Sequence, residues 1–238
     1  MNIPARETAI TGICLAILLG LGTWQVERLQ WKERVIADLQ TLYDSSASLP
    51  SLSEETLNAL DQENLRFAYG HIDGTPEKDK AVLVGPVSRD GRMGYNLLVP
   101  LKTDHQKDVI VNAGWVDDLW KDTLEDRLGI FPARVTIKGL ARKPDWSRFA
   151  SKNSPENNLW FRPDPAEIAR AKELGEIHGT IVYADRIDPP LQDVIPQEEK
   201  WYPRNMHRQY AIFWYGMAVI LLAVYGFYLR GLTNKKAP

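Results

Sequence analysis

Histidine and cysteine are the residues of this chain best suited to bind a metal ion or act as nucleophiles, and both are scarce. The four histidines, His71, His105, His178 and His207, are too widely spread in sequence to indicate a site by spacing. The single cysteine, Cys14, excludes an intramolecular disulfide and a paired-thiolate site for copper or zinc. The sequence also lacks a nucleophile elbow, a phosphate-binding loop and a dinucleotide fingerprint. We therefore predict no enzyme activity, and we interpret His71, His105 and His178 as ordinary surface or turn residues.

His207 differs from the other histidines because it lies just before a long apolar segment. Its imidazole is predicted to lie at the rim of a bilayer, near Asn205 and Gln209. A neutral imidazole is a good axial ligand for haem iron. An interfacial residue that caps the helix or binds lipid headgroups would have the same position, so position alone leaves both interpretations open.

Two apolar segments, residues 9–24 and 210–229, must position His207. Each approaches or reaches the roughly 20 residues that span a bilayer. Aromatic residues typical of bilayer interfaces lie near the ends of the second segment: Trp214, Tyr215, Tyr225 and Tyr228. The first segment follows Arg6 as a signal peptide would, but no Ala-x-Ala cleavage pattern follows it. We predict two retained transmembrane helices, although the shorter first segment is also compatible with a buried core helix.

The two segments define the predicted topology. Residues 1–8 form a cytoplasmic N-terminus, residues 25–209 a periplasmic soluble domain, and residues 230–238 a cytoplasmic C-terminus. Basic residues without acids after the second segment favour this orientation. The chain has 29 basic and 31 acidic groups, and its central part is acidic, which excludes nucleic acid as a partner. Because the first segment begins so early, no transit peptide precedes it, and we expect a bacterial cell inner-membrane protein.

The central region is predicted to be one β-rich α+β domain with a few short helices. Residues 25–43 continue the first helix into the aqueous phase, since apolar positions recur there on one face. A serine-rich linker follows, and Ser51 with Glu54 resembles a capping box that opens a helix to Leu60. Asp164, Pro165 and Gly175 delimit another helix. Six β-favouring runs with few helices between them predict an antiparallel sheet or small barrel: residues 66–73, 81–86, 95–101, 109–116, 134–141 and 180–185.

Two motifs lie at the predicted membrane boundaries: GLGTWQVERLQWK at residues 20–32 and RNMHRQYAIFWYG at residues 204–216. They closely resemble the corresponding motifs of the Surfeit-locus (Surf) assembly proteins of cytochrome c oxidase. Three internal landmarks follow the family order: NLRF at residues 64–67, VIVNAGWV at residues 109–116, and NSPENNLW at residues 153–160. The chain departs from the family at Ala113, Asp117 and Met206, where Arg, Pro and a second Asn or acid are usual. The resemblance covers nearly the whole chain.

The resemblance implies an accessory protein that builds haem-copper oxidases. Bacterial members are thought to receive haem a and to assist its insertion into oxidase subunit I, with His207 as the implied iron ligand. Metal binding is thus expected only at His207, through haem iron. Subunit I, membrane lipid and, as a further candidate, haem a synthase are the implied partners. A scaffold without cofactor that stabilises subunit I is the alternative, and the resemblance leaves open whether the oxidase uses cytochrome c or quinol.

Four further residues could surround a haem. Arg28 lies one helical turn beyond Trp24, so its guanidinium could pair with a propionate, but it could equally hold the helix structurally. Trp214 and Tyr215 could flank a porphyrin, although interfacial anchoring alone explains them. A stripe of Gly12, Ala16 and Gly20, spaced four residues apart, would allow close approach of either the second helix or a flat ring.

The predicted topology places Ser48 and Lys235 on opposite sides of the membrane. In a Cys14→Ser background, we expect an impermeant maleimide to label Ser48→Cys but not Lys235→Cys in intact cells, because only the periplasmic side is accessible. Permeabilised cells, in which both cysteines react, are the control. Labelling of Lys235→Cys alone contradicts the orientation.

Overall fold

The computed structural model describes residues 4–44, 49–197 and 200–234 and divides the chain into two units. The first, here called the helical unit, consists of residues 1–40 and 202–238. The second, here called the sheet domain, consists of residues 41–201. Most of the predicted serine linker and the predicted topology markers lie outside the described residues: Ser45, Ser46, Ser48, Lys235 and Lys236.

Two long helices, α1 (Ala5–Asp44) and α5 (His207–Asn234), make up most of the helical unit. Both are long and apolar enough to cross a membrane by length and composition. Their apolar side chains are largely exposed, as Ile17 and Val219 illustrate at 56% and 66% exposure. The predicted extension of the first helix to about residue 44 is confirmed.

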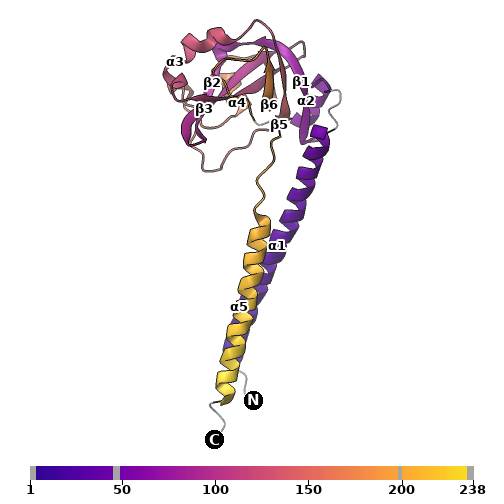
Figure 1. The fold of residues 1–238 in the computed structure, drawn as a ribbon, viewed down its shortest axis with the longest axis vertical. Helices are drawn as coiled ribbons and strands as arrows, with labels where there is room; N and C mark the ends of the chain where they lie inside the picture. Colours follow the sequence, from indigo (N-terminus) through magenta and orange to yellow (C-terminus); the bar gives the residue numbers. More distant parts are fainter. Residues whose placement is uncertain (1–3, 45–48, 198–199, 235–238) are drawn as a thin grey trace. The chain divides into compact units, whose positions relative to one another are not determined.

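Paired hydroxyl groups connect α1 and α5 along their length. Thr8 Oγ1 contacts Tyr225 Oη at 2.5 Å, and Thr23 Oγ1 contacts Tyr215 Oη at 3.1 Å. Because residue numbers rise along α1 as they fall along α5, the two helices are antiparallel, and they lie side by side in Figure 1. The pairs fix the register between the helices.

The sheet domain is built on six strands in the spatial order β1-β5-β6-β4-β3-β2. Their bounds are β1 Phe67–Pro76, β2 Val82–Arg89, β3 Arg92–Lys102, β4 Asp108–Asp117, β5 Val135–Arg142 and β6 Ile177–Asp188. Thr75 and Pro76 of β1 also pair with Lys102 and Leu101 of β3. This additional pairing closes β1, β5, β6, β4 and β3 into a ring, as the curved sheet in Figure 1 illustrates.

The prediction of an antiparallel sheet is wrong at one pairing. β4 and β6 run parallel, with Asp108 opposite Ile177 and Val111 opposite Val182, so the sheet is mixed. Parallel neighbours need a long connection. The segment between these strands contains β5 and two helices, which supply that length.

Three short α-helices lie on the sheet domain: α2 (Glu54–Asp61), α3 (Trp120–Arg127) and α4 (Pro165–Ala171). Three 3₁₀ turns accompany them: η1 (Lys78–Lys80), η2 (Leu128–Ile130) and η3 (Pro155–Asn157). The predicted cap at Asp164 is confirmed, since its side chain accepts from two backbone N–H groups. Three expectations were inaccurate: Ser53 rather than Ser51 caps α2, α4 ends before Gly175, and α3 was not predicted.

The core lies on both faces of β4, whose residues 109–116 are all buried. One cluster contains Val109 and Val111 and packs against apolar residues of α2 and α3. The other contains Ile110 and packs against Trp160 and Ile168 of α4. A strand covered on both faces favours an apolar run, and Asn112 is the only polar side chain in residues 109–116.

Gly114 allows a bulge in β4 and a close approach by the chain near residue 195. Its φ is +141°, and a Cβ would lie 2.3 Å from the carbonyl oxygen of Ile195. Trp115 and Ile195 exchange two backbone hydrogen bonds at 2.7 and 2.8 Å. The bulge shifts the alternation, so that Val116 joins the core.

We expect Gly114→Ala to lower the free energy of unfolding by about 2–4 kcal/mol, because the added Cβ combines an unfavourable φ with a backbone clash. Gly129→Ala is the matched control, since a Cβ there meets no atom within 4 Å. Denaturant unfolding of both variants, followed by tryptophan fluorescence, measures the difference. Equal stabilities of the two variants would contradict this role of Gly114.

Candidate functional site

His207 begins α5 and is held by two side chains. Asn205 Oδ1 accepts a hydrogen bond from the His207 backbone N–H at 3.4 Å, which partly satisfies the start of the helix. On the other side, His207 Nδ1 lies 2.7 Å from Oε1 of Gln25, a residue of α1 only 8% exposed. Because an amide oxygen can only accept, Nδ1 carries the proton and Nε2 carries the lone pair.

The His207 ring also contacts Trp24, another residue predicted to surround a haem. The ring centroids lie 6.4 Å apart with an interplanar angle of 85°, an edge-on contact. Trp24 itself is 54% exposed. Gln25 was not predicted as a site residue. The sequence signal that could have indicated its role was its position next to Trp24 in the motif at residues 20–32.

Arg28 lies one turn further along α1 and stacks on Trp31 rather than on Trp24. Its guanidinium carbon is 4.0 Å from the centroid of the Trp31 ring. Within the described parts of the chain, no ion pair of Arg28 is formed. The cation is thus placed by an aromatic face, which leaves its N–H groups able to donate to an anion.

Tyr215 and Trp214 differ in what they contact. Tyr215 is half-buried and bonds Thr23, so it serves the pairing of α1 with α5. Trp214 packs edge-on against its neighbour Phe213 at 5.3 Å. Neither residue has a direct ring contact with His207 among those the described residues form.

The small-residue stripe does not mark where the helices approach most closely. A Cβ at Gly12 or Gly20 would meet no atom within 4 Å, so the expectation that these glycines pair the helices is wrong. Gly22 has that role instead, since its Cβ would lie 2.8 Å from the Tyr215 ring.

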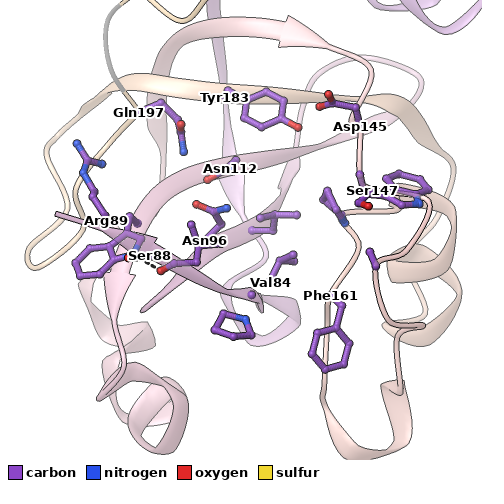
Figure 2. Close-up of a pocket in the computed structure, with 18 of the residues that line it drawn as sticks. Val84, Ser88, Arg89, Asn96, Asn112, Asp145, Ser147, Phe161, Tyr183 and Gln197 are labelled. Carbon is purple, nitrogen blue, oxygen red and sulfur yellow. Dashed lines mark hydrogen bonds between the residues drawn. The ribbon is translucent and has the colours of Figure 1, made fainter. Parts of the chain in front are cut away.

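A pocket of about 630 Å³ opens on the sheet domain and mixes polar with apolar walls. Figure 2 shows Asn96, Asn112, Tyr183 and Gln197 around the hollow, with Phe161 on a separate segment. The loop after β5 contributes a further wall that includes Asp145, Trp146 and Ser147.

Arg142 at the end of β5 is fixed at one side of this pocket. Its guanidinium lies 4.1 Å from the Tyr183 ring centroid and 4.3 Å from that of Trp201, and Nη1 donates to Asp145 at 2.8 Å. Burial raises the pKa of the Tyr183 hydroxyl, and the positive charge of Arg142 opposes that effect. The pocket therefore presents the uncharged phenol of Tyr183 beside the Arg142 cation, whose charge is balanced by Asp145.

The interpretation of His178 as a surface or turn residue is wrong. Its side chain is completely buried on β6, and Nδ1 lies 2.8 Å from Asp61 Oδ2. His105 and Glu54 lie close to it. His71 fits the interpretation better, since it is half-buried with Nδ1 3.1 Å from the Leu49 carbonyl.

Burial raises the pKa of both carboxyl groups around His178, but attractive interactions outweigh it. The Asp61 pKa is lowered overall, by hydrogen bonds from His178 and Thr180 and by the charge of His178. The Glu54 pKa is likewise lowered, chiefly by the charge of His178. Both groups are therefore ionised at neutral pH.

These features define a class of protein with two long apolar helices that are paired in register through polar side chains. A closed mixed-sheet domain lies between the two helices in the chain. The chain matches the SURF1 family over residues 12–219 and belongs to that family. It is similar to a SURF1-like protein of Rickettsia felis, with 26% identity over 96% of this chain and 99% of the relative.

Eukaryotic relatives show a similar level of likeness. A SURF1-like protein of Monosiga brevicollis is 27% identical over 92% of this chain and 86% of its own length. Human Surfeit locus protein 1 is 26% identical over 84% of this chain and 69% of its own length. The likeness therefore extends across both helices and the sheet domain.

Proposed function

We propose that this chain is an assembly factor for a haem-copper terminal oxidase of the cytochrome c type, which binds haem a and assists its insertion into subunit I. Membership of the SURF1 family supports the role in assembly. Two helices able to cross a membrane and a bacterial relative support a location in the cell inner membrane, with the sheet domain in the periplasm. Haem a synthase is a further candidate partner, as the donor of the cofactor.

The bond between Gln25 and His207 carries the haem proposal. Histidines that ligate metals usually donate their second ring N–H to an oxygen acceptor, which fixes the tautomer and the ring orientation. The 2.7 Å contact from Nδ1 to Gln25 provides such an acceptor and leaves Nε2 as the donor to iron. The residues present therefore fit a haem ligated by His207, and haem a when bound supplies the iron centre destined for the oxidase.

Arg28 and Trp24 would complete the surroundings of the cofactor. Trp24 offers an exposed apolar indole beside His207, suited to a porphyrin. Arg28 offers a guanidinium stacked on Trp31, suited to a propionate carboxylate. Trp214 stays a weaker candidate, and Tyr215 can contribute only its ring, since its hydroxyl bonds Thr23.

A scaffold without cofactor is the second candidate function. Phe149 is 89% exposed and Trp146 is 40% exposed, both on the loop that borders the 630 Å³ pocket. Exposed aromatic side chains beside a pocket are typical of protein contact surfaces. In this reading, the loop holds subunit I during assembly and His207 serves only the helix pair.

We expect His207→Ala protein, purified from cells that make haem a, to lose the haem Soret band because the iron ligand is gone. Gln25→Leu is expected to weaken haem binding by about 10–100-fold, since the imidazole loses its orienting acceptor. Arg28→Ala should weaken haem retention in a salt-dependent manner. Absorbance at equal protein yield measures all three effects.

His71→Ala is the matched control, because it removes a histidine from the sheet domain and should leave the Soret band unchanged. Circular dichroism confirms that each variant is folded. A His207→Ala protein with the wild-type spectrum and haem stoichiometry contradicts the ligand assignment and favours the scaffold.

Deleting the gene should lower the amount of active haem a oxidase while haem a itself remains detectable, because an assembly factor places the cofactor and does not make it. Haem extraction and oxidase assays on the same membranes measure both quantities, with the complemented strain as control. Complete loss of haem a would instead indicate an enzyme of haem a synthesis.

A further inference from the structure

Two histidines and a glutamate from three separate elements converge in the sheet domain. Glu54 opens α2, His105 lies in the turn between β3 and β4, and His178 lies on β6. Each offers one atom able to bind a metal, and these atoms lie within 4.8 Å of one another. Glu54 Oε2 is 3.5 Å from His178 Nε2 and 3.9 Å from His105 Nδ1.

The nitrogen atoms that face Glu54 are buried and lack hydrogen-bond partners. This holds for His178 Nε2 and His105 Nδ1 throughout the described chain. The His178 side chain is 0% exposed, so no solvent compensates its nitrogen. Unsatisfied buried polar atoms are uncommon and costly, which calls for a specific explanation.

Asp61 determines which form of His178 faces Glu54. Asp61 Oδ2 accepts from His178 Nδ1 at 2.8 Å, and Asp61 Oδ1 accepts from the Thr180 hydroxyl at 2.9 Å. In the neutral form of His178, the proton stays on Nδ1 and the lone pair of Nε2 is directed at a carboxylate oxygen. Two electron-rich atoms then face each other across 3.5 Å, whereas in the charged form Nε2 carries a second proton and pairs with Glu54.

A metal cation between His178 Nε2, His105 Nδ1 and Glu54 Oε2 would give all three atoms a partner, which a proton cannot do. A proton on His178 Nε2 would satisfy that atom but leave His105 Nδ1 without a partner. Glu54 Oε2 already accepts from the Gln106 backbone N–H at 3.2 Å, while Oε1 accepts from Asn58 at 3.2 Å, so the carboxylate is held in place. One ion at the centre would satisfy both imidazoles and the carboxylate together.

We propose that Glu54, His105 and His178 bind a divalent transition-metal ion of the zinc type, with Asp61 as the positioning residue behind His178. Two imidazoles and one carboxylate suit Zn²⁺, and three protein ligands leave a fourth position for water or another ligand. A carboxylate hydrogen-bonded to the far nitrogen of a ligating histidine is a common second contact at zinc sites.

Binding requires a small contraction of the cluster. Zinc–ligand bonds of about 2.0–2.1 Å place neighbouring ligand atoms of a tetrahedral site roughly 3.3 Å apart. The separation between Glu54 and His178 is already close to this value, whereas that to His105 must shorten. The turn that contains His105 would move toward Glu54, because His178 is fixed by its place on β6 and by its hydrogen bond to Asp61.

Zn²⁺ binding to the full-length protein in detergent, after removal of metals with EDTA, tests the proposal. We expect one equivalent of Zn²⁺ in calorimetry, a Zn²⁺-dependent rise in the unfolding temperature, and tetrahedral ligand-field absorption when Co²⁺ replaces Zn²⁺. His105→Ala and Glu54→Gln should abolish the Co²⁺ bands. Asp61→Asn should weaken Zn²⁺ binding by about 10–100-fold.

His71→Ala and His207→Ala are the controls, since both histidines lie outside the cluster, and both should keep Zn²⁺ binding. Because His178 is buried, His178→Ala risks misfolding, and the half-buried His105 and Glu54 carry the test instead. Absence of Zn²⁺ binding overturns the proposal, as does binding that persists in the His105→Ala/Glu54→Gln double variant. Either result leaves the haem proposal at His207 unaffected.

Discussion

The parallel pairing of β4 with β6 is the constraint on which the sheet domain depends. β4 is buried on both faces, so its side chains must alternate between two core clusters. That alternation directs Asn112 to the pocket, and the bulge at Gly114 then redirects Trp115 to the same pocket. At its other end, the register of Asp108 with Ile177 brings the turn of His105 beside His178. The lining of the pocket by Asn112 and Trp115 and the proximity of His105 to His178 both depend on the place of β4 beside β6.

In the helical unit, pairs of polar side chains are the constraint that determines how the elements pack. Gln25 with His207, Thr23 with Tyr215 and Thr8 with Tyr225 connect two otherwise apolar helices. In the proposed bilayer, an unpaired polar group would be costly, so these contacts favour one register over its neighbours. Gly22 permits the close approach that the register requires. The position of His207 is thus a consequence of how the helices pair.

Local signals in the sequence were sufficient for the six strands and for α1, α2, α4 and α5, but not for α3. All six strands lie where alternation and turn residues place them, and Asp164 caps α4 because its side chain acts on adjacent backbone groups. Long-range pairing was not predictable in the same way, because a buried β4 reads equally well as an antiparallel or a parallel strand. Because the direction of the pairing was not predictable, the cluster of Glu54, His105 and His178 was not predictable either. Glu54, His105 and His178 are distant in sequence, and only the parallel register of β4 and β6 would have indicated that two of them meet.

The two histidine sites follow one design but differ in charge. In each, Nδ1 lies close to an oxygen acceptor, and Nε2 is left to donate its lone pair to a metal. His207 bonds the neutral Gln25, and His178 bonds the ionised Asp61. A porphyrin brings its own two negative charges to iron, so a neutral acceptor behind the axial imidazole is sufficient. A bare divalent ion brings no counter-charge, and burying it requires compensation from the protein. Glu54 and Asp61 supply two negative charges around His178. Charge balance therefore supports the proposed haem at His207 and the proposed divalent ion at His178, rather than the reverse arrangement.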